Sequence, residues 1–351
     1  MKNTLLILTV LILAATYAAR AETVIAAAAQ PQLAADAKGT VWVTFGRGKE
    51  VHVARSEDGG LTFAPAVRVA SLPSLMLGRR RGPRIVAHDG KVTLTAMAGD
   101  LHAFRSTDGG RAWTGPFRVN DRARSAREGL NALAVAPDGR LVAAWLDLRG
   151  ERTQLHCAES TDGGMTWTDN YPIYRAPGGE TVCECCHPSL AFGAGGELFA
   201  MWRNALGGAR DPWFSRRPMG SAEFAPAAKL GEGTWTLRAC PMDGGAVAAL
   251  ADGLVSVWQR EGRVFLARPS EPERDLGPGT QPVVAAAMGR VIVVWQRGQG
   301  LWMTTGDGMG AANSLTEEGK FPALLAIPSQ GGFLAAYERG DAIVIRRVEV
   351  E

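Results

Sequence analysis

The chain contains 351 residues, of which 46% are hydrophobic, and its 38 Lys and Arg against 35 Asp and Glu give a formal net charge of +3. This near balance argues against nucleic acid or an anionic membrane surface as the main partner. Length alone suggests two domains, a prior that repeat architectures commonly exceed.

The first 21 residues predict an export signal. Lys2 precedes the apolar run LLILTVLILAA, and Ala19-Arg20-Ala21 forms a small-x-small cleavage site before Glu22. The apolar run is short for a membrane span, and no later segment approaches one. We therefore expect a signal peptide at residues 1–21, a single domain at residues 22–351, and a periplasmic or secreted protein.

Seven copies of one phrase follow, each made of two apolar runs joined by a glycine-containing turn. The copies begin at Pro31, Pro83, Asn131, Pro188, Pro241, Pro282 and Pro322. Their second runs end on a bulky residue: Phe45, Met97, Trp145, Trp202, Trp258, Trp295 and Tyr337. Each phrase predicts a β-hairpin. The spacing between copies leaves room for two further short strands, so we expect an all-β chain with four strands per repeat, a β-propeller.

The two ends of the chain predict how the ring closes. The last repeat is followed by one more strand, AIVIRRVEV, whereas the strand TVIAAAA stands alone before the first repeat. The N-terminal strand is expected to complete the last blade, which removes open sheet edges. We predict seven four-stranded blades, with six as the alternative because the last three repeats are compressed.

Three repeats carry a second phrase after their third strand: SEDGGLTF, STDGGRAW and STDGGMTW. Asp-Gly-Gly suits a tight turn, because glycine adopts positive φ and aspartate accepts backbone N–H bonds. The phrases resemble the Asp box, Ser-x-Asp-x-Gly-x-x-Trp, of the sialidase-like superfamily, also called the BNR repeat. The matching positions are Ser56, Asp58, Gly60, Phe63, Ser106, Asp108, Gly110, Trp113, Ser160, Asp162, Gly164 and Trp167.

The resemblance implies a propeller whose Asp boxes form turns on the face away from any active site. An exo-α-sialidase would also need an arginine triad, a tyrosine nucleophile paired with a glutamate, and an aspartic acid/base. Tyr337 is the nucleophile candidate, although it falls where other repeats place a packing tryptophan. Asp147 and Glu128 are the acid/base candidates. Arg84 lacks the proline of the family's Arg-Ile-Pro motif, so sialidase activity stays an alternative.

Arginines gather in the loops that are expected to surround the channel mouth, which are those before each first strand and after each second strand. A guanidinium-rich face suits a carboxylate or phosphate ligand through paired hydrogen bonds. We expect an anionic small molecule, a glycan or a protein partner there, bound by a monomeric chain; a solvated rim of charges is the alternative. The candidate ligand-binding residues are Arg84, Arg203, Arg238, Arg260, Arg297 and Arg339.

The segment VCECCHPS at residues 182–189 holds three of the five cysteines. His187 precedes the fourth repeat and Cys240 precedes the fifth, so the two occupy equivalent positions on neighbouring blades. Cys157 lies in a third strand and is expected to be a buried structural thiol. The residues expected to meet at the channel mouth are Cys183, Cys185, Cys186, His187 and Cys240.

Three chemistries compete for this cluster. Thiolates together with the thioether of Met242 favour Cu(I), with zinc next. An exported chain could instead form two disulfides and need no cofactor. Cys183-x-x-Cys186-His187 also matches the attachment pattern of c-type haem, with His187 as axial ligand. We therefore hypothesise a metal-binding propeller; the alternatives are a sialidase-type hydrolase, a haem-bearing propeller and a protein-interaction platform.

Overall fold

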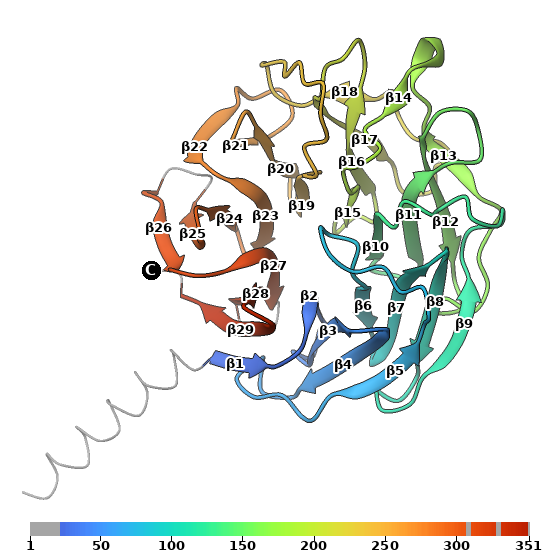
Figure 1. The fold of residues 1–351 in the computed structure, drawn as a ribbon, viewed down its shortest axis with the longest axis vertical. Helices are drawn as coiled ribbons and strands as arrows, with labels where there is room; N and C mark the ends of the chain where they lie inside the picture. Colours follow the sequence, from blue (N-terminus) through green and yellow to red (C-terminus); the bar gives the residue numbers. More distant parts are fainter. Residues whose placement is uncertain (1–21, 307–309, 328–330, 350–351) are drawn as a thin grey trace, which may run out of the picture.

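The computed structural model describes residues 22–306, 310–327 and 331–349, and the expected signal peptide lies outside this part of the chain. Seven antiparallel sheets form a ring around a central axis (Figure 1). The first strand of each sheet contacts the first strands of both neighbouring sheets, and the seventh contacts the first. The predicted seven-bladed β-propeller is confirmed, and the six-bladed alternative is wrong.

The blades follow the chain in order, and each is numbered here by its place in the ring. Blade 1 consists of β2 (Ala29–Ala35), β3 (Val41–Arg47), β4 (Glu50–Ser56) and β5 (Val67–Ser71). Blade 2 consists of β6 (Arg84–His88), β7 (Lys91–Ala98), β8 (Asp100–Ser106) and β9 (Thr114–Arg118). Blade 3 consists of β10 (Asn131–Val135), β11 (Leu141–Asp147), β12 (Gln154–Ser160) and β13 (Tyr171–Tyr174).

A single 3₁₀ turn, η1 (Pro177–Gly179), leads into the second half of the ring. Blade 4 consists of β15 (Ser189–Phe192), β16 (Leu198–Ala205), β17 (Pro212–Arg217) and β18 (Ala228–Lys229), with the short β14 (Thr181–Val182) added along β16. Blade 5 consists of β19 (Ala246–Leu250), β20 (Gly253–Arg260), β21 (Arg263–Ala267) and β22 (Arg274–Pro278). Blade 6 consists of β23 (Thr280–Ala287), β24 (Arg290–Arg297), β25 (Gly300–Thr305) and β26 (Asn313–Thr316). Blade 7 consists of β27 (Lys320–Ile327), β28 (Gly332–Arg339), β29 (Ala342–Val348) and β1 (Glu22–Ile25).

The core of the molecule is divided among the joints between neighbouring blades. Each of the seven joints holds its own cluster of buried apolar side chains, drawn from the facing sheets. The bulky residues that end the second strands lie in these clusters; Trp145, Trp258 and Tyr337, for example, are 0% exposed. Burial of large aromatic and aliphatic side chains between sheets is therefore the main stabilising term in every joint.

The N-terminal strand closes the ring as predicted. β1 pairs antiparallel with β29, and Glu22 lies opposite Arg346. The Glu22 carboxylate also contacts Arg339 at 2.9 Å and the Tyr337 hydroxyl at 3.3 Å. The edge of the last sheet is thus covered by main-chain pairing and by an ion pair.

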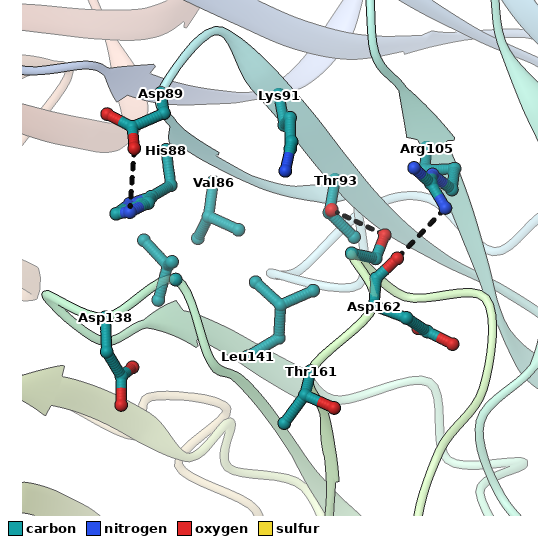
Figure 2. A pocket seen from close by; sticks show the side chains of 13 residues that line it. Val86, His88, Asp89, Lys91, Thr93, Arg105, Asp138, Leu141, Thr161 and Asp162 are labelled. Atoms are coloured by element: carbon teal, nitrogen blue, oxygen red, sulfur yellow. Dashed lines mark hydrogen bonds and ion pairs between the residues drawn. The ribbon is translucent and has the colours of Figure 1, made fainter.

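The three Asp-box turns join neighbouring blades. Inside each turn, the serine hydroxyl donates to the aspartate, which in turn accepts backbone N–H bonds from the residues that follow. The turn carbonyls face the preceding blade and accept hydrogen bonds from it. Trp42 Nε1 donates to Gly109 O at 2.9 Å, and Arg347 Nη2 donates to Gly59 O at 3.1 Å. Figure 2 shows the third case, in which Thr93 and Arg105 of blade 2 reach the turn of blade 3.

Gly60, the second glycine of the first Asp box, lies where this turn packs closely against blade 7. Gly60 has a φ of +85°, and a Cβ atom added there would lie 2.4 Å from Leu334 Cδ1 in blade 7. Leu334 is 0% exposed, so it has no room to move aside. Positive φ and close packing together exclude a side chain at this position.

We predict that Gly60→Ala lowers the free energy of unfolding by roughly 1–3 kcal/mol beyond the cost of the positive φ, because Leu334 must be displaced. Gly90→Ala is the matched control: its φ is +73° but no atom lies within 4 Å of an added Cβ, so it costs only about 1 kcal/mol. Urea denaturation of both variants measures the difference. Equal losses would contradict the packing argument.

Candidate functional site

The central channel holds a cavity of about 210 Å³ whose lining comes from the first strands of all seven blades. Arg80 and His187 lie along this lining, and Arg80 comes from the segment between β5 and β6 that reaches toward the axis in Figure 1. The Arg80 guanidinium donates to the Gln281 side chain at 2.9 Å, to Gln281 O at 3.0 Å and to Pro322 O at 2.6 Å. Blade 2 is thereby tied to blades 6 and 7 across the axis.

Arg80 is a buried charge held by neutral oxygen atoms. Its side chain is 5% exposed, and burial lowers its pKa to about 10, so the guanidinium stays charged at neutral pH. Asp243 and Glu338 supply nearby negative charge. The residue therefore braces the ring across its axis.

We predict that Arg80→Ala destabilises the fold by about 2–4 kcal/mol, because the carbonyl groups of Gln281 and Pro322 lose their donor. Arg79→Ala is the control, since Arg79 is exposed and also has positive φ; its cost is expected to stay within about 0.5 kcal/mol. Urea titration compares the two variants. An Arg80→Ala variant as stable as the wild type would contradict this bracing role.

Most of the predicted ligand-binding arginines already have partners in the protein. Arg84 donates to Asn131 O at 3.1 Å and to Gly82 O at 3.0 Å, and burial lowers its pKa to about 9. Arg203 is 1% exposed and donates to the carbonyls of Asp243 and Gln259. Both side chains therefore cross-link loops around the channel.

The other four arginines differ in their surroundings. Arg260 pairs with the Glu273 carboxylate, and Arg339 pairs with Glu22. Arg297 is exposed, and its Cζ atom lies 4.2 Å from the centroid of the Trp302 ring. Arg238 is exposed on the loop before β19. Within the described residues, only Arg238 and Arg297 of the predicted set are exposed. Four of the six predicted arginines are thus engaged with protein groups, and ligand binding by the set stays a prediction.

The predicted catalytic candidates have structural surroundings. Asp147 is 1% exposed, accepts from Trp145 Nε1 at 2.8 Å and pairs with Arg149 at 2.8 Å. Burial raises the pKa of Asp147, but the hydrogen bonds from Arg149 outweigh it and hold the pKa below its usual value, so the carboxylate has no proton to donate. Tyr337 lies in the core between blades 6 and 7, where burial raises its pKa. Glu128 is half-buried in the loop before β10.

A tyrosine, glutamate and arginine do meet, but on the Asp-box face. In a groove between blades 3 and 4, Tyr171 OH contacts Glu159, and Arg217 contacts both. Burial raises the pKa of Tyr171, so its hydroxyl stays protonated and is no nucleophile. Burial raises the pKa of Glu159 as well, yet hydrogen bonds from Arg217, Tyr171 and Arg140 hold that pKa at about 2.

The Glu159 carboxylate gives a pH-dependent contribution to stability. Its pKa is lower in the folded state than the ordinary 4.5, so the contribution is complete above pH 4.5 and is lost as the pH falls toward 2. We predict that Glu159→Gln destabilises the protein at pH 7 and by less at pH 3, measured by urea denaturation. Glu57→Gln is the control, because Glu57 is 70% exposed. A loss that is the same at both pH values would contradict the assignment.

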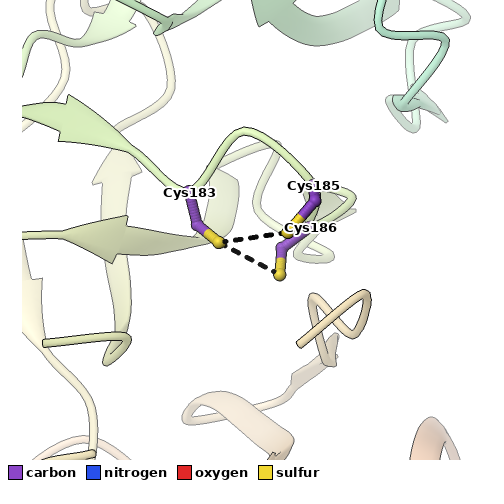
Figure 3. Close-up of side chains that lie close together, drawn as sticks. All are labelled: Cys183, Cys185 and Cys186. Carbon is purple, nitrogen blue, oxygen red and sulfur yellow. Dashed lines mark hydrogen bonds between the residues drawn. The ribbon is translucent and has the colours of Figure 1, made fainter. Parts of the chain in front are cut away.

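Three cysteines form a compact cluster at the mouth end of blade 4. The segment after β14 turns back on itself, with Cys186 N donating to Cys183 O at 3.4 Å. The Cys183 sulfur lies 3.3 Å from that of Cys186 and 3.7 Å from that of Cys185 (Figure 3). All three sulfurs lie within 4.8 Å of one another. Hydrogen bonding with Cys185 and Cys186 lowers the pKa of the Cys183 thiol.

The remaining members of the predicted ligand set are placed differently. Cys240 is exposed and lies outside the compact group of three. Met242 packs against the thiols. His187 lines the channel, where its Nδ1 lies 3.4 Å from Gly244 N. The prediction that all five residues meet is therefore wrong for His187, because the chain turns at Cys186 and enters β15 with the imidazole on the channel side.

Cys157 stands apart from the cluster. It is 0% exposed in β12, and burial raises its pKa to about 12. A protonated, inaccessible thiol is chemically inert. The prediction of a buried structural thiol is confirmed.

No helix in the described part of the chain is long and apolar enough to cross a membrane. No protein-family model matches the sequence, and no curated protein matches it. Solved structures resemble the fold at low identity. A protein of unknown function from Dyadobacter fermentans is 15% identical, with 94% of this chain and 98% of that chain covered and a TM-score of 0.56.

Two of the similar structures are carbohydrate-active enzymes. A polysaccharide lyase, an ulvan lyase, is 11% identical over 91% of this chain and 93% of its own, with a TM-score of 0.56. An α-L-arabinanase from Penicillium chrysogenum is 13% identical over 93% and 98%, with a TM-score of 0.53. At these identities the likeness concerns the fold alone. The β-propeller fold that the repeats and the Asp-box phrases predict is thus shared with these two enzymes.

Proposed function

We propose that this chain is an exported β-propeller that binds a soft metal ion, Cu(I) in the first place and Zn(II) in the second, through Cys183, Cys185 and Cys186. The observation that carries the proposal is the group of three buried sulfurs within 4.8 Å of one another. The exposed fractions of the three residues are 1%, 8% and 1%, so an ion held there is shielded from water. Thiolate is the ligand that Cu(I) and Zn(II) prefer.

The sulfur spacing fits a shared ion. A tetrahedral zinc–thiolate site with Zn–S bonds of about 2.3 Å places its sulfurs about 3.8 Å apart. The distances of 3.3 Å and 3.7 Å approach that value and are far from the S–S bond of about 2.05 Å. The adjacent thioether of Met242 adds a soft donor, which favours Cu(I).

A disulfide or a covalently attached haem at these cysteines would need larger structural changes than metal binding. A disulfide between Cys183 and Cys186 requires oxidation and a shortening of their separation by more than 1 Å. Covalent haem requires Cys183 and Cys186 to be reached by a macrocycle, yet each is 1% exposed. His187 lines the channel and is not in the group formed by the three thiols, so it is poorly placed as an axial ligand.

Glycan binding at the mouth is a second candidate function. It is favoured by the arabinanase and the ulvan lyase, which share this fold. Arg238 and Arg297, which are exposed, are the candidates from the predicted set for contact with an acidic sugar. Turnover of sialosides or acidic polysaccharides that is lost in Arg238→Ala would support this candidate.

We predict that the reduced protein binds one Cu(I) per chain in competition with a chromophoric chelator. Replacing Cys183, Cys185 and Cys186 together with serine is expected to abolish this binding. Cys157→Ala is the matched control and retains it, because Cys157 is buried in β12 and is not one of the three grouped sulfurs. Thiol counting under denaturing conditions accompanies each titration. A wild-type protein with five free thiols that takes up neither Cu(I) nor Zn(II) would refute the proposal.

A further inference from the structure

We propose that Cys240 is the entry ligand of the metal site: it receives the ion from an external thiol donor and passes it to Cys185. This inference rests on the proposed metal binding. It assigns to Cys240 a kinetic role instead of a place among the resident ligands. The donor class is a small thiol or a thiol-bearing protein that carries Cu(I).

The exposure of the four sulfurs forms a gradient. Cys240 is exposed, Cys185 is 8% exposed, and Cys183 and Cys186 are each 1% exposed. Met242, two residues after Cys240, packs against these thiols, so the Cys240 segment borders the cluster. Cys185 is the most exposed of the three resident thiols and is therefore the first that an ion arriving from Cys240 would meet.

The segment that carries Cys240 suits such a role. It runs between β18 and β19 with little regular structure, and the Cys240 thiol is exposed there. Two residues later the chain is anchored, because Met242 O accepts from Gln281 Nε2 at 2.8 Å and Asp243 accepts from Gln281 N at 2.6 Å. The anchor keeps Cys240 beside the cluster while leaving its side chain exposed.

The transfer is a sequence of ligand exchanges. The bond from Cu(I) to Cys240 forms as a bond to the donor sulfur breaks, and the bond to Cys185 then forms as the bond to Cys240 breaks. Each incoming thiol loses its proton, which the departing sulfur or water takes up. The copper stays Cu(I) throughout, so no oxidant or reductant is needed.

The test compares equilibrium binding with loading rate in Cys240→Ser. We expect one Cu(I) per chain at an affinity within about threefold of wild type, but loading from a Cu(I)–glutathione complex slowed by about tenfold or more, because the attacking thiol is absent. Stopped-flow absorbance follows loading, and chelator competition gives the affinity. Cys157→Ala is expected to change neither quantity, and thermal melting establishes that both variants are folded.

The outcomes separate this inference from the proposed function. A Cys240→Ser protein that loads as fast as wild type overturns the entry role. A Cys240→Ser protein that loses its ion or much of its affinity also overturns it, because Cys240 is then a fourth resident ligand. Failure of the wild-type protein itself to bind Cu(I) overturns the metal site as a whole.

Discussion

Closure of the ring is the constraint on which the rest of the molecule depends. Each blade buries its apolar faces only against its two neighbours, so all seven clusters exist together only if the first and last blades meet. Pairing of β1 with β29, the Glu22 ion pairs and the Arg80 bridge across the axis all hold the ring closed. Once it is closed, loops from distant parts of the sequence are brought together at the mouth.

The candidate site is a product of that geometry. Cys185 and Cys240 lie 55 positions apart in the sequence, yet each precedes the first strand of its blade, and blades 4 and 5 are neighbours. The packing of Met242, from the Cys240 segment, against the thiols of blade 4 therefore follows from blade order. The same closure limits what the mouth can accept, because Arg80, Arg84 and Arg203 are bound to protein carbonyls there.

Much of the fold could be predicted from the sequence, because hairpin phrases and turn glycines are local signals. The repeat from Pro31 to Pro322 predicts the blade number, and the unpaired strand at Thr23 predicts the closure. The site was harder to predict, since it depends on side-chain direction. The turn at Cys186 directs His187 to the channel, and Arg80 bonds residues more than 200 positions away. Neither feature leaves a periodic pattern in the sequence.

The hydrogen bonds between Asp-box turns and neighbouring blades are distributed unevenly around the ring. In the described residues they join blades 7 and 1, 1 and 2, and 2 and 3. In these three consecutive joints, hydrogen bonds from the Asp-box turns add to the apolar packing. The joint between blades 4 and 5, which carries the cysteines, has no such Asp-box contact in the described part of the chain. That joint is held instead at the other end of its strands, where Arg203 of blade 4 donates to Asp243 O and Gln259 O. The two halves of the ring are therefore fastened at opposite faces of the molecule.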